Sequence, residues 1–173
     1  MQLHLLTATA FALGAALAFA PPAVSADLPQ EGSFTTHLAG TYNAEATKVG
    51  DKRFIISGTT PLIIYNDAGS GPLHRGSAVC KWWNDDVNGS YRDNGICAFG
   101  DAGGADKIFV EWSGKGTDNG DEQGAGTITS GTGKYDGIQG KMVYQCKRID
   151  LALRLFDCTQ RFDYWLKAAS TTR

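Results

Sequence analysis

Four cysteines could either form disulfides or bind a metal ion. No two of them have the CxxC spacing typical of structural zinc sites, and His37 and His74 lie far from any ligand-like spacing. The stretch Asn84–Gly89 has the spacing that begins a calcium loop, but Gly95 stands where such a loop needs a bidentate Glu. An even number of cysteines without a metal-ligand pattern predicts two disulfides and no metal site. The four residues are Cys80, Cys97, Cys146 and Cys158.

A catalytic constellation cannot be assembled from the remaining residues. With the cysteines in disulfides and only two histidines outside the leader, no Ser-His-Asp or Cys-His set is available. A cyclase or isomerase would need a buried acid or base, and the candidates are Glu45, Glu111 and Arg75. A charge on the outer face of a strand explains each of these as well. We therefore predict no catalytic residue and no cofactor.

The glycine-rich stretch GTITSGTGKYDGIQGK, residues 126–141, could be a phosphate loop, a linker or a bend in a sheet. A phosphate loop needs the ending GK[ST] before a helix, whereas KMVYQC, which is typical of a strand, follows here. Recurring apolar residues disfavour a disordered linker. Glycines inside strands mark bulges and barrel corners, so the run predicts a bend. The structural glycines are Gly131, Gly133, Gly137 and Gly140.

Local patterns around the cysteines select one disulfide pairing. If Cys146 faces Cys158 in an antiparallel hairpin, Lys147 faces Asp157 and the apolar residues gather on one face. The turn then falls at residues 150–153. If Cys80 faces Cys97, the turn is Asn88-Gly89, the preferred dipeptide of a type I′ hairpin, and Asp85 faces Arg92. The predicted bridges are Cys80–Cys97 and Cys146–Cys158.

The N-terminal segment has the features of a secretory signal. An apolar stretch, Leu5–Ala20, precedes two prolines and small residues that suit cleavage before Asp27. This stretch is shorter than the roughly 20 residues that cross a bilayer. We predict a signal peptide at residues 1–26, a single mature domain at 27–173, and a periplasmic or secreted location. A formal net charge of −2 gives no reason to expect nucleic acid or an anionic membrane as a partner.

The mature segment alternates like β-structure and shows almost no helical periodicity. Short extended segments separated by Gly- and Asp-rich turns predict an all-β fold, a single antiparallel closed or nearly closed barrel of about eight strands. The stretch SGKGTDNGDEQGAG, residues 113–126, is predicted to be a long hairpin loop. The expected strands are 33–39, 42–48, 53–57, 62–65, 77–83, 95–99, 107–112, 126–130, 141–148 and 154–167.

Two segments resemble known barrel proteins. GTITSGTGKYDGIQGKMVY is similar to the GGTGKF segment of the allene oxide cyclase and dirigent class, and to the GGTGKYxGIxG motif of exported bacterial proteins of uncharacterised function. GICAFGDAGGADKIFVEWSGKG is similar to a GxCxxxDxDGDxxxxxW stretch of the same bacterial proteins. The resemblance covers residues 95–144. It implies a β-barrel and a homo-oligomer, dimeric or trimeric, and no catalytic residue of those enzymes can be matched here.

A closed barrel of about eight strands encloses room for one small ligand. The aromatic residues predicted to line the site of a mostly apolar ligand are Trp82, Trp83, Trp112 and Tyr144. Adjacent Trp82 and Trp83 must point to opposite faces of a strand, so one of them faces away from the lumen. Each of these residues could also be plain core. Two alternatives remain: a cyclase- or isomerase-type barrel enzyme, and an interaction protein that presents exposed loops and Trp side chains.

Overall fold

The protein is a closed antiparallel β-barrel of eight strands with one further strand outside it, which confirms the predicted fold class. The computed structural model describes residues 28–118 and 120–167, so the predicted signal peptide lies outside the described residues. Within those ranges no helix is long and apolar enough to cross a membrane. The strands are β1 (Glu31–Thr41), β2 (Asn43–Gly50), β3 (Arg53–Asn66), β4 (Gly76–Val87), β5 (Ser90–Gly100), β6 (Lys107–Thr117), β7 (Asp121–Gly131), β8 (Ile138–Asp150) and β9 (Leu155–Leu166).

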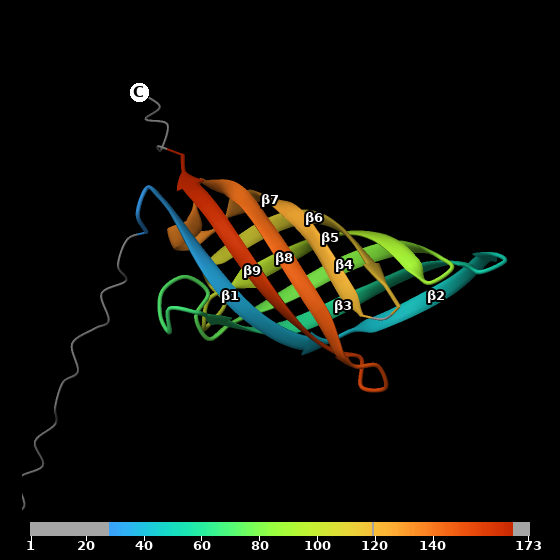
Figure 1. Ribbon diagram of the computed structural model, residues 1–173. Helices are drawn as coiled ribbons and strands as arrows, with labels where there is room; N and C mark the ends of the chain where they lie inside the picture. Colours follow the sequence, from blue (N-terminus) through green and yellow to red (C-terminus); the bar gives the residue numbers. More distant parts are fainter. Residues whose placement is uncertain (1–27, 119, 168–173) are drawn as a thin grey trace, which may run out of the picture.

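Strand β1 closes the barrel by pairing with both β9 and the second half of β3. Strand β2 continues β1 in the same register and pairs with the first half of β3, so this ribbon extends past the barrel wall (Figure 1). The break between β1 and β2 lies opposite Pro61, which has no N–H to donate to a neighbouring strand. The sequence predicted two strands, 53–57 and 62–65, but the structure joins them into β3 through Pro61.

The predicted hairpin registers are confirmed. Cys146 lies opposite Cys158 and Lys147 opposite Asp157, with the turn at residues 151–154. Cys80 lies opposite Cys97. Asn88 and Gly89 adopt φ values of 57° and 79°, as a type I′ turn requires. Both cysteine pairs are joined as disulfides in the predicted pairing.

Of the two glycine-rich segments, one differs from the prediction. The predicted hairpin loop at 113–126 is mostly strand, because β6 runs to Thr117 and β7 begins at Asp121. The run at 126–141 comprises the end of β7, a connection at 132–137 that contains a short 3₁₀ turn, η1 (Gly133–Tyr135), and the start of β8. Gly133 and Gly137 have φ values of 60° and 75° there. Gly131 and Gly140 lie so close to backbone carbonyls that a Cβ would collide with them.

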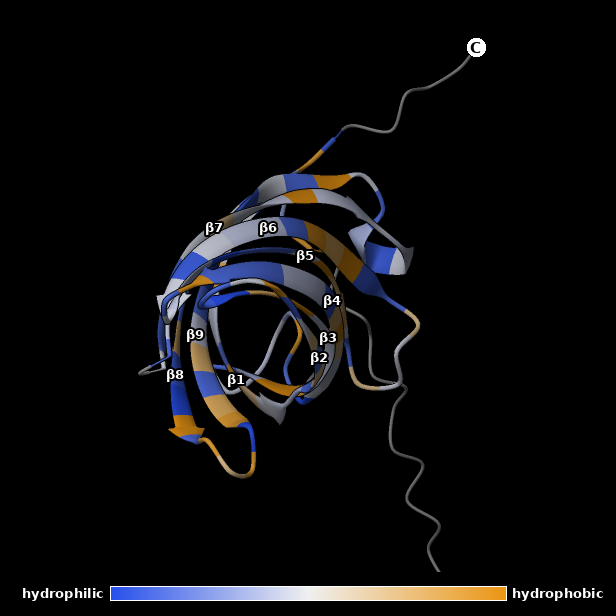
Figure 2. Ribbon diagram, turned by 90° about the vertical axis from the view of Figure 1, so that its right-hand side faces the viewer, coloured by the Kyte–Doolittle hydropathy of each residue, from blue (hydrophilic) through white to orange (hydrophobic). Residues whose placement is uncertain are grey.

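One end of the barrel is plugged. We call it the capped end; its loops are 67–75, 101–106 and 132–137. Leu73 and Tyr135 are fully buried there, and Asp101 Oδ1 accepts hydrogen bonds from Leu73 N at 2.7 Å and from the Tyr135 hydroxyl at 2.9 Å. Lys134 forms an ion pair with the same carboxylate. The view along the barrel shows the strands as a ring with η1 beside it (Figure 2).

Below this plug the interior is filled by aromatic and aliphatic side chains. Phe162 is fully buried, stacks on Phe34 with ring centroids 4.8 Å apart, and meets Phe99 edge-on at 5.5 Å. Ile64, Ile108, Ile128 and Ile138 are also buried in the same cluster. Inward residues alternate with outward ones along each strand, so the half of the barrel nearest the cap is solid core.

Candidate functional site

The opposite half of the barrel contains a cavity. This end, which we call the hairpin end, is formed by the turns that join β2 to β3, β4 to β5, β6 to β7 and β8 to β9. The cavity has a volume of about 160 Å³ and reaches from Met142 in the middle of the barrel to Tyr42 and Arg148 at the mouth. The Tyr42 ring lies 5.8 Å from the guanidinium carbon of Arg148 and equally far from that of Arg154. Every strand of the barrel contributes residues to the lining, so a small molecule inside would be surrounded by all eight strands.

Several of the aromatic residues that line this space lie directly across from glycines. Trp82 lies directly across from Gly58, Trp112 from Gly95, and Tyr144 from Gly124. A Cβ at Gly95 or Gly124 would lie 2.6 Å from the facing ring, so each ring lies against the backbone of the neighbouring strand. Rings held against the wall in this way leave the centre of the barrel free. The pair formed by Tyr91 and Gly116 continues the pattern.

Three of the four aromatic residues predicted to line a ligand site do line the cavity. They are Trp82, Trp112 and Tyr144. Trp82 donates a hydrogen bond from Nε1 to Thr60 Oγ1 at 2.8 Å, and the Trp112 ring meets Tyr144 edge-on at 5.6 Å. Trp83 points outward and is 50% exposed, so it is the member of the Trp pair that faces away from the lumen. The alternation of side chains along a strand predicted that one of the two tryptophans points inward and the other outward, but not which one.

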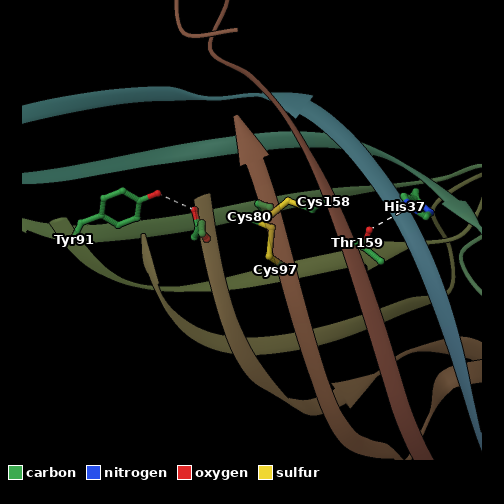
Figure 3. Close-up of a disulfide and its surroundings, with 8 residues drawn as sticks. His37, Cys80, Tyr91, Cys97, Cys158 and Thr159 are labelled. Carbon is green, nitrogen blue, oxygen red and sulfur yellow. Dashed lines mark hydrogen bonds between the residues drawn. A yellow bond between two sulfur atoms is a disulfide. The ribbon is translucent and has the colours of Figure 1, made fainter. Parts of the chain in front are cut away.

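Both disulfides also face the cavity. All four cysteines line it, and each bridge joins directly opposed residues on neighbouring strands with Cα atoms 4.0 Å apart. Figure 3 shows the Cys80–Cys97 bridge on the inner surface of the barrel. The bridges therefore tie together the half of the barrel that has the least internal packing. Two disulfides also indicate that the chain folds in an oxidising compartment.

Several buried polar atoms at the cavity have no hydrogen-bond partner. They are Asn84 Oδ1, Asp93 Oδ1, Trp112 Nε1, the Tyr144 hydroxyl and Gln160 Oε1. Leaving a buried polar group unpaired costs about 1–3 kcal/mol, so native proteins keep such groups few. Five of them around one cavity indicate a site that is completed by a bound molecule, either ordered water or a polar ligand.

Two carboxyl groups, Asp93 and Glu122, project into the cavity from β5 and β7. Asp93 is only 4% exposed, and Glu122 accepts a hydrogen bond from the Tyr91 hydroxyl at 3.3 Å (Figure 3). Burial, followed by the negative charge of Glu122, raises the pKa of Asp93 to about 8. Burial and the same charge raise the pKa of Tyr144 as well. The pair therefore holds a proton at neutral pH that an isolated Asp would have lost.

The sequence did not identify these two acids. Glu45 and Glu111, the acids proposed for an enzyme, are exposed on the outer faces of β2 and β6, and Arg75 is exposed in the loop after β3. The signal that could have found Asp93 is its place in the predicted hairpin, an even number of residues from Cys97 on the same face. Glu122 lay in a segment predicted to be a loop, so no face could be assigned to it.

A second cluster lies on the outside of the barrel. His37 Nε2 is 3.1 Å from Thr159 Oγ1 (Figure 3). Its Nδ1 is 2.6 Å from Asp67 Oδ1, and this order of groups occurs in acyl-transfer enzymes. All three side chains are exposed. Strand β9 is paired on both sides along this stretch, so its N–H groups serve the sheet and not an oxyanion. The cluster therefore serves to link β1, β9 and the loop after β3.

The fold and the site define a class: a small antiparallel barrel whose strands follow one another in sequence, packed at one end and hollow at the other. Barrels of this size commonly hold one small ligand. No protein-family model matches the chain, and no curated protein matches it in sequence. The function must therefore be argued from the cavity itself.

Proposed function

We propose that the protein binds one small molecule inside the hairpin end of its barrel. The observation that carries this proposal is a cavity of about 160 Å³ surrounded by five buried polar atoms that lack partners. A solid core would have no such cavity. Export to the periplasm or the medium, predicted from the N-terminal segment, would place such a binding protein outside the cytoplasm.

The size of the cavity limits the ligand to about one six-membered ring. A cavity of about 150 Å³ holds one benzene molecule. The apolar part of the cavity lining consists of Trp82, Trp112, Met142 and the two disulfides, which such a ring would contact. The ligand is therefore a compact, mostly apolar molecule.

The polar atoms define the other end of the ligand. Asn84, Asp93 and Gln160 present unpaired oxygens, and Trp112 presents an unpaired N–H. Asn84 and Gln160 offer acceptors, whereas the Trp112 N–H and the protonated Asp93 are donors, so the complementary molecule carries a polar group that donates as well as accepts, such as a hydroxyl. An apolar ring with one donor-bearing group satisfies both requirements.

Acid–base catalysis on the bound molecule is a second candidate function. It is favoured by the raised pKa of Asp93, since a carboxyl group that keeps its proton at neutral pH beside a second carboxyl group is typical of acid–base sites. Such an enzyme would be of the cyclase or isomerase type. Kinship with the allene oxide cyclase and dirigent class, and the homo-oligomer it implies, stay predictions. Chemical conversion of the bound molecule, followed by mass spectrometry, would separate catalysis from binding.

A titration of ring-sized compounds tests the binding proposal. Benzyl alcohol added to the purified protein should change the fluorescence of Trp82 and Trp112, which line the cavity. Ile56→Trp, which adds bulk to the cavity wall near the mouth, should abolish this change. The matched control is Ile63→Trp on the same strand, whose side chain is exposed on the outer face. An unchanged response in Ile56→Trp, or no response in the wild type, would refute binding in the lumen.

A further inference from the structure

We propose that the molecule bound in the hairpin end is a small organic amine, held as its ammonium ion by Asp93 and Glu122. This inference rests on the proposed function and names the chemical class of its ligand. It starts from the fact that the two carboxyl groups share a buried site without a bonded cation among the described residues. The described salt bridges involve neither of them.

Charged and titratable groups surround Asp93 on every side. Glu122 from β7 and Tyr144 from β8 lie close to it, and Tyr91 neighbours it on β5. On β4, Asn84 lies directly opposite and Asp86 lies nearer the turn, where its carboxylate accepts a hydrogen bond from Gly89 N at 3.0 Å. Gly114 of β6 adds no side chain. Two cations of β8, Lys147 and Arg148, also line the cavity; Arg148 donates to the carbonyl of Asp118 at 3.3 Å and lies 5.8 Å over the Tyr42 ring.

The unpaired oxygens converge on the position that an ammonium group would occupy. A Cβ at Gly114 would collide with the Tyr144 hydroxyl and would lie 2.7 Å from Asp93 Oδ1, so these two oxygens lie against the same glycine. Both residues are at least 94% buried, and neither atom has a partner. An ammonium group carries three donors and no acceptor, which suits a cluster of unpaired acceptor oxygens.

The rest of the cavity fits an amine better than a metal ion. The described residues contain no group of three or more His, Cys, Asp or Glu side chains that could hold a metal. The wall consists instead of aromatic rings, Trp112 and Tyr144 among them, whose faces attract organic cations. A carboxylate beside aromatic rings therefore favours a cation that also has an apolar body.

Binding of the ammonium ion should release a proton. Without ligand, Asp93 keeps its proton, because its own burial and the negative charge of the half-buried Glu122 both disfavour its ionised form. The ammonium ion supplies the positive charge in place of that proton, so Asp93 ionises when the ion binds. The ligand keeps its own proton, and the proton of Asp93 goes to the buffer.

Isothermal titration calorimetry with benzylamine and benzyl alcohol tests this inference, because the two probes match in size and differ in charge. At pH 7, benzylamine should bind at least about tenfold more tightly than benzyl alcohol, as expected for a close charge pair. Repeating the titration in buffers of different ionisation enthalpy should show the release of about one proton per benzylamine bound. Benzyl alcohol should release none.

Substitution of the two acids locates the effect. Asp93→Asn and Glu122→Gln should each remove the preference for benzylamine while leaving benzyl alcohol bound. The matched control, Asp163→Asn, changes an exposed carboxylate on the outer face of β9 and should keep the preference. Equal affinity of the two probes, or binding of benzylamine without proton release, would overturn the amine assignment alone. Failure of both probes to bind would overturn binding in the lumen as well.

Discussion

The two halves of this barrel are built from the same strands but are filled in different ways. In the capped half, Phe34, Phe99 and Phe162 interlock at the centre. In the hairpin half, Trp112 and Tyr144 lie against glycines of the neighbouring strands and leave the centre open. The difference lies in what occupies the centre, because Tyr164 in the capped half also lies against a glycine, Gly32, yet that half is filled by the three phenylalanines.

The same comparison explains where the covalent bonds are. The capped half is stabilised by packing and by the hydrogen bonds that Asp101 accepts from its plug. The hairpin half has less packing, and both disulfides cross it. The two halves therefore differ in what stabilises them, and the following variants separate these contributions.

The largest loss of stability is expected in the capped half. Phe162→Ala should lower the free energy of unfolding by about 3–5 kcal/mol, since a fully buried ring is removed from a packed cluster. Tyr144→Phe in the hairpin half should change it by less than about 1 kcal/mol, because the lost hydroxyl has no partner. Urea unfolding measures both variants, and similar losses would contradict the contrast between the halves.

Removal of one disulfide should have the next largest effect. Replacing Cys146 and Cys158 together by Ala should lower the free energy of unfolding by about 3 kcal/mol, as expected when a short loop is no longer closed. The Cys80 and Cys97 double variant should lose a similar amount. Unfolding curves with and without a reductant measure the effect. If reduction leaves the wild-type curve unchanged, the bridges do not stabilise the hairpin half.

Filling a glycine position should have a smaller, local effect. The Cβ of Gly95→Ala would lie 2.6 Å from both Trp112 and the carbonyl of Lys81, and this overpacking should cost about 1–3 kcal/mol. It should also shift the fluorescence of Trp112. The control is Gly50→Ala in β2, where the nearest atom is 3.7 Å away. A Gly95 variant as stable as this control would mean that the rings do not need the glycines.

The acid pair should make stability depend on pH in one direction. Because the pKa of Asp93 is raised to about 8, the native state binds more protons than the unfolded chain between about pH 4 and pH 8. Stability due to Asp93 should therefore fall as pH rises through this window. Asp93→Asn should remove this loss, which exceeds about 1.4 kcal/mol, the value for one pKa unit.

Urea unfolding at pH 5 and pH 9 measures this dependence. Asp163→Asn, which changes an exposed carboxylate, should keep the wild-type dependence. Parallel pH curves for the wild type and Asp93→Asn would show that Asp93 is not protonated in the native barrel.

Local sequence was sufficient for the parts of the fold that are set by neighbouring strands. Asn88-Gly89 and the matched charges around Cys146 and Cys158 each fix one register, because a shift by one residue would turn apolar side chains outward. The number and spacing of the strands predicted a closed barrel. They could not predict which strands close it, because β1 and β9, which pair, lie at the two ends of the domain.

The site was only partly visible in the sequence for a related reason. Trp82, Trp112 and Tyr144 stand out by residue type, but the glycines that hold their rings against the wall lie on other strands. Glycine lowers strand propensity, so the segment at 113–126 was predicted to be a loop. In the structure this segment is mostly strand. Its glycines face aromatic residues on the neighbouring strands, and Glu122 points into the cavity.

The most direct test of the account is a crystal structure of the protein soaked with benzyl alcohol. The account predicts one ordered ring in the lumen of the hairpin end, among Trp82, Trp112 and Met142, with its hydroxyl toward the unpaired oxygens near Asp93. A lumen closed by side chains, or a ring bound only on the outer surface, would contradict it.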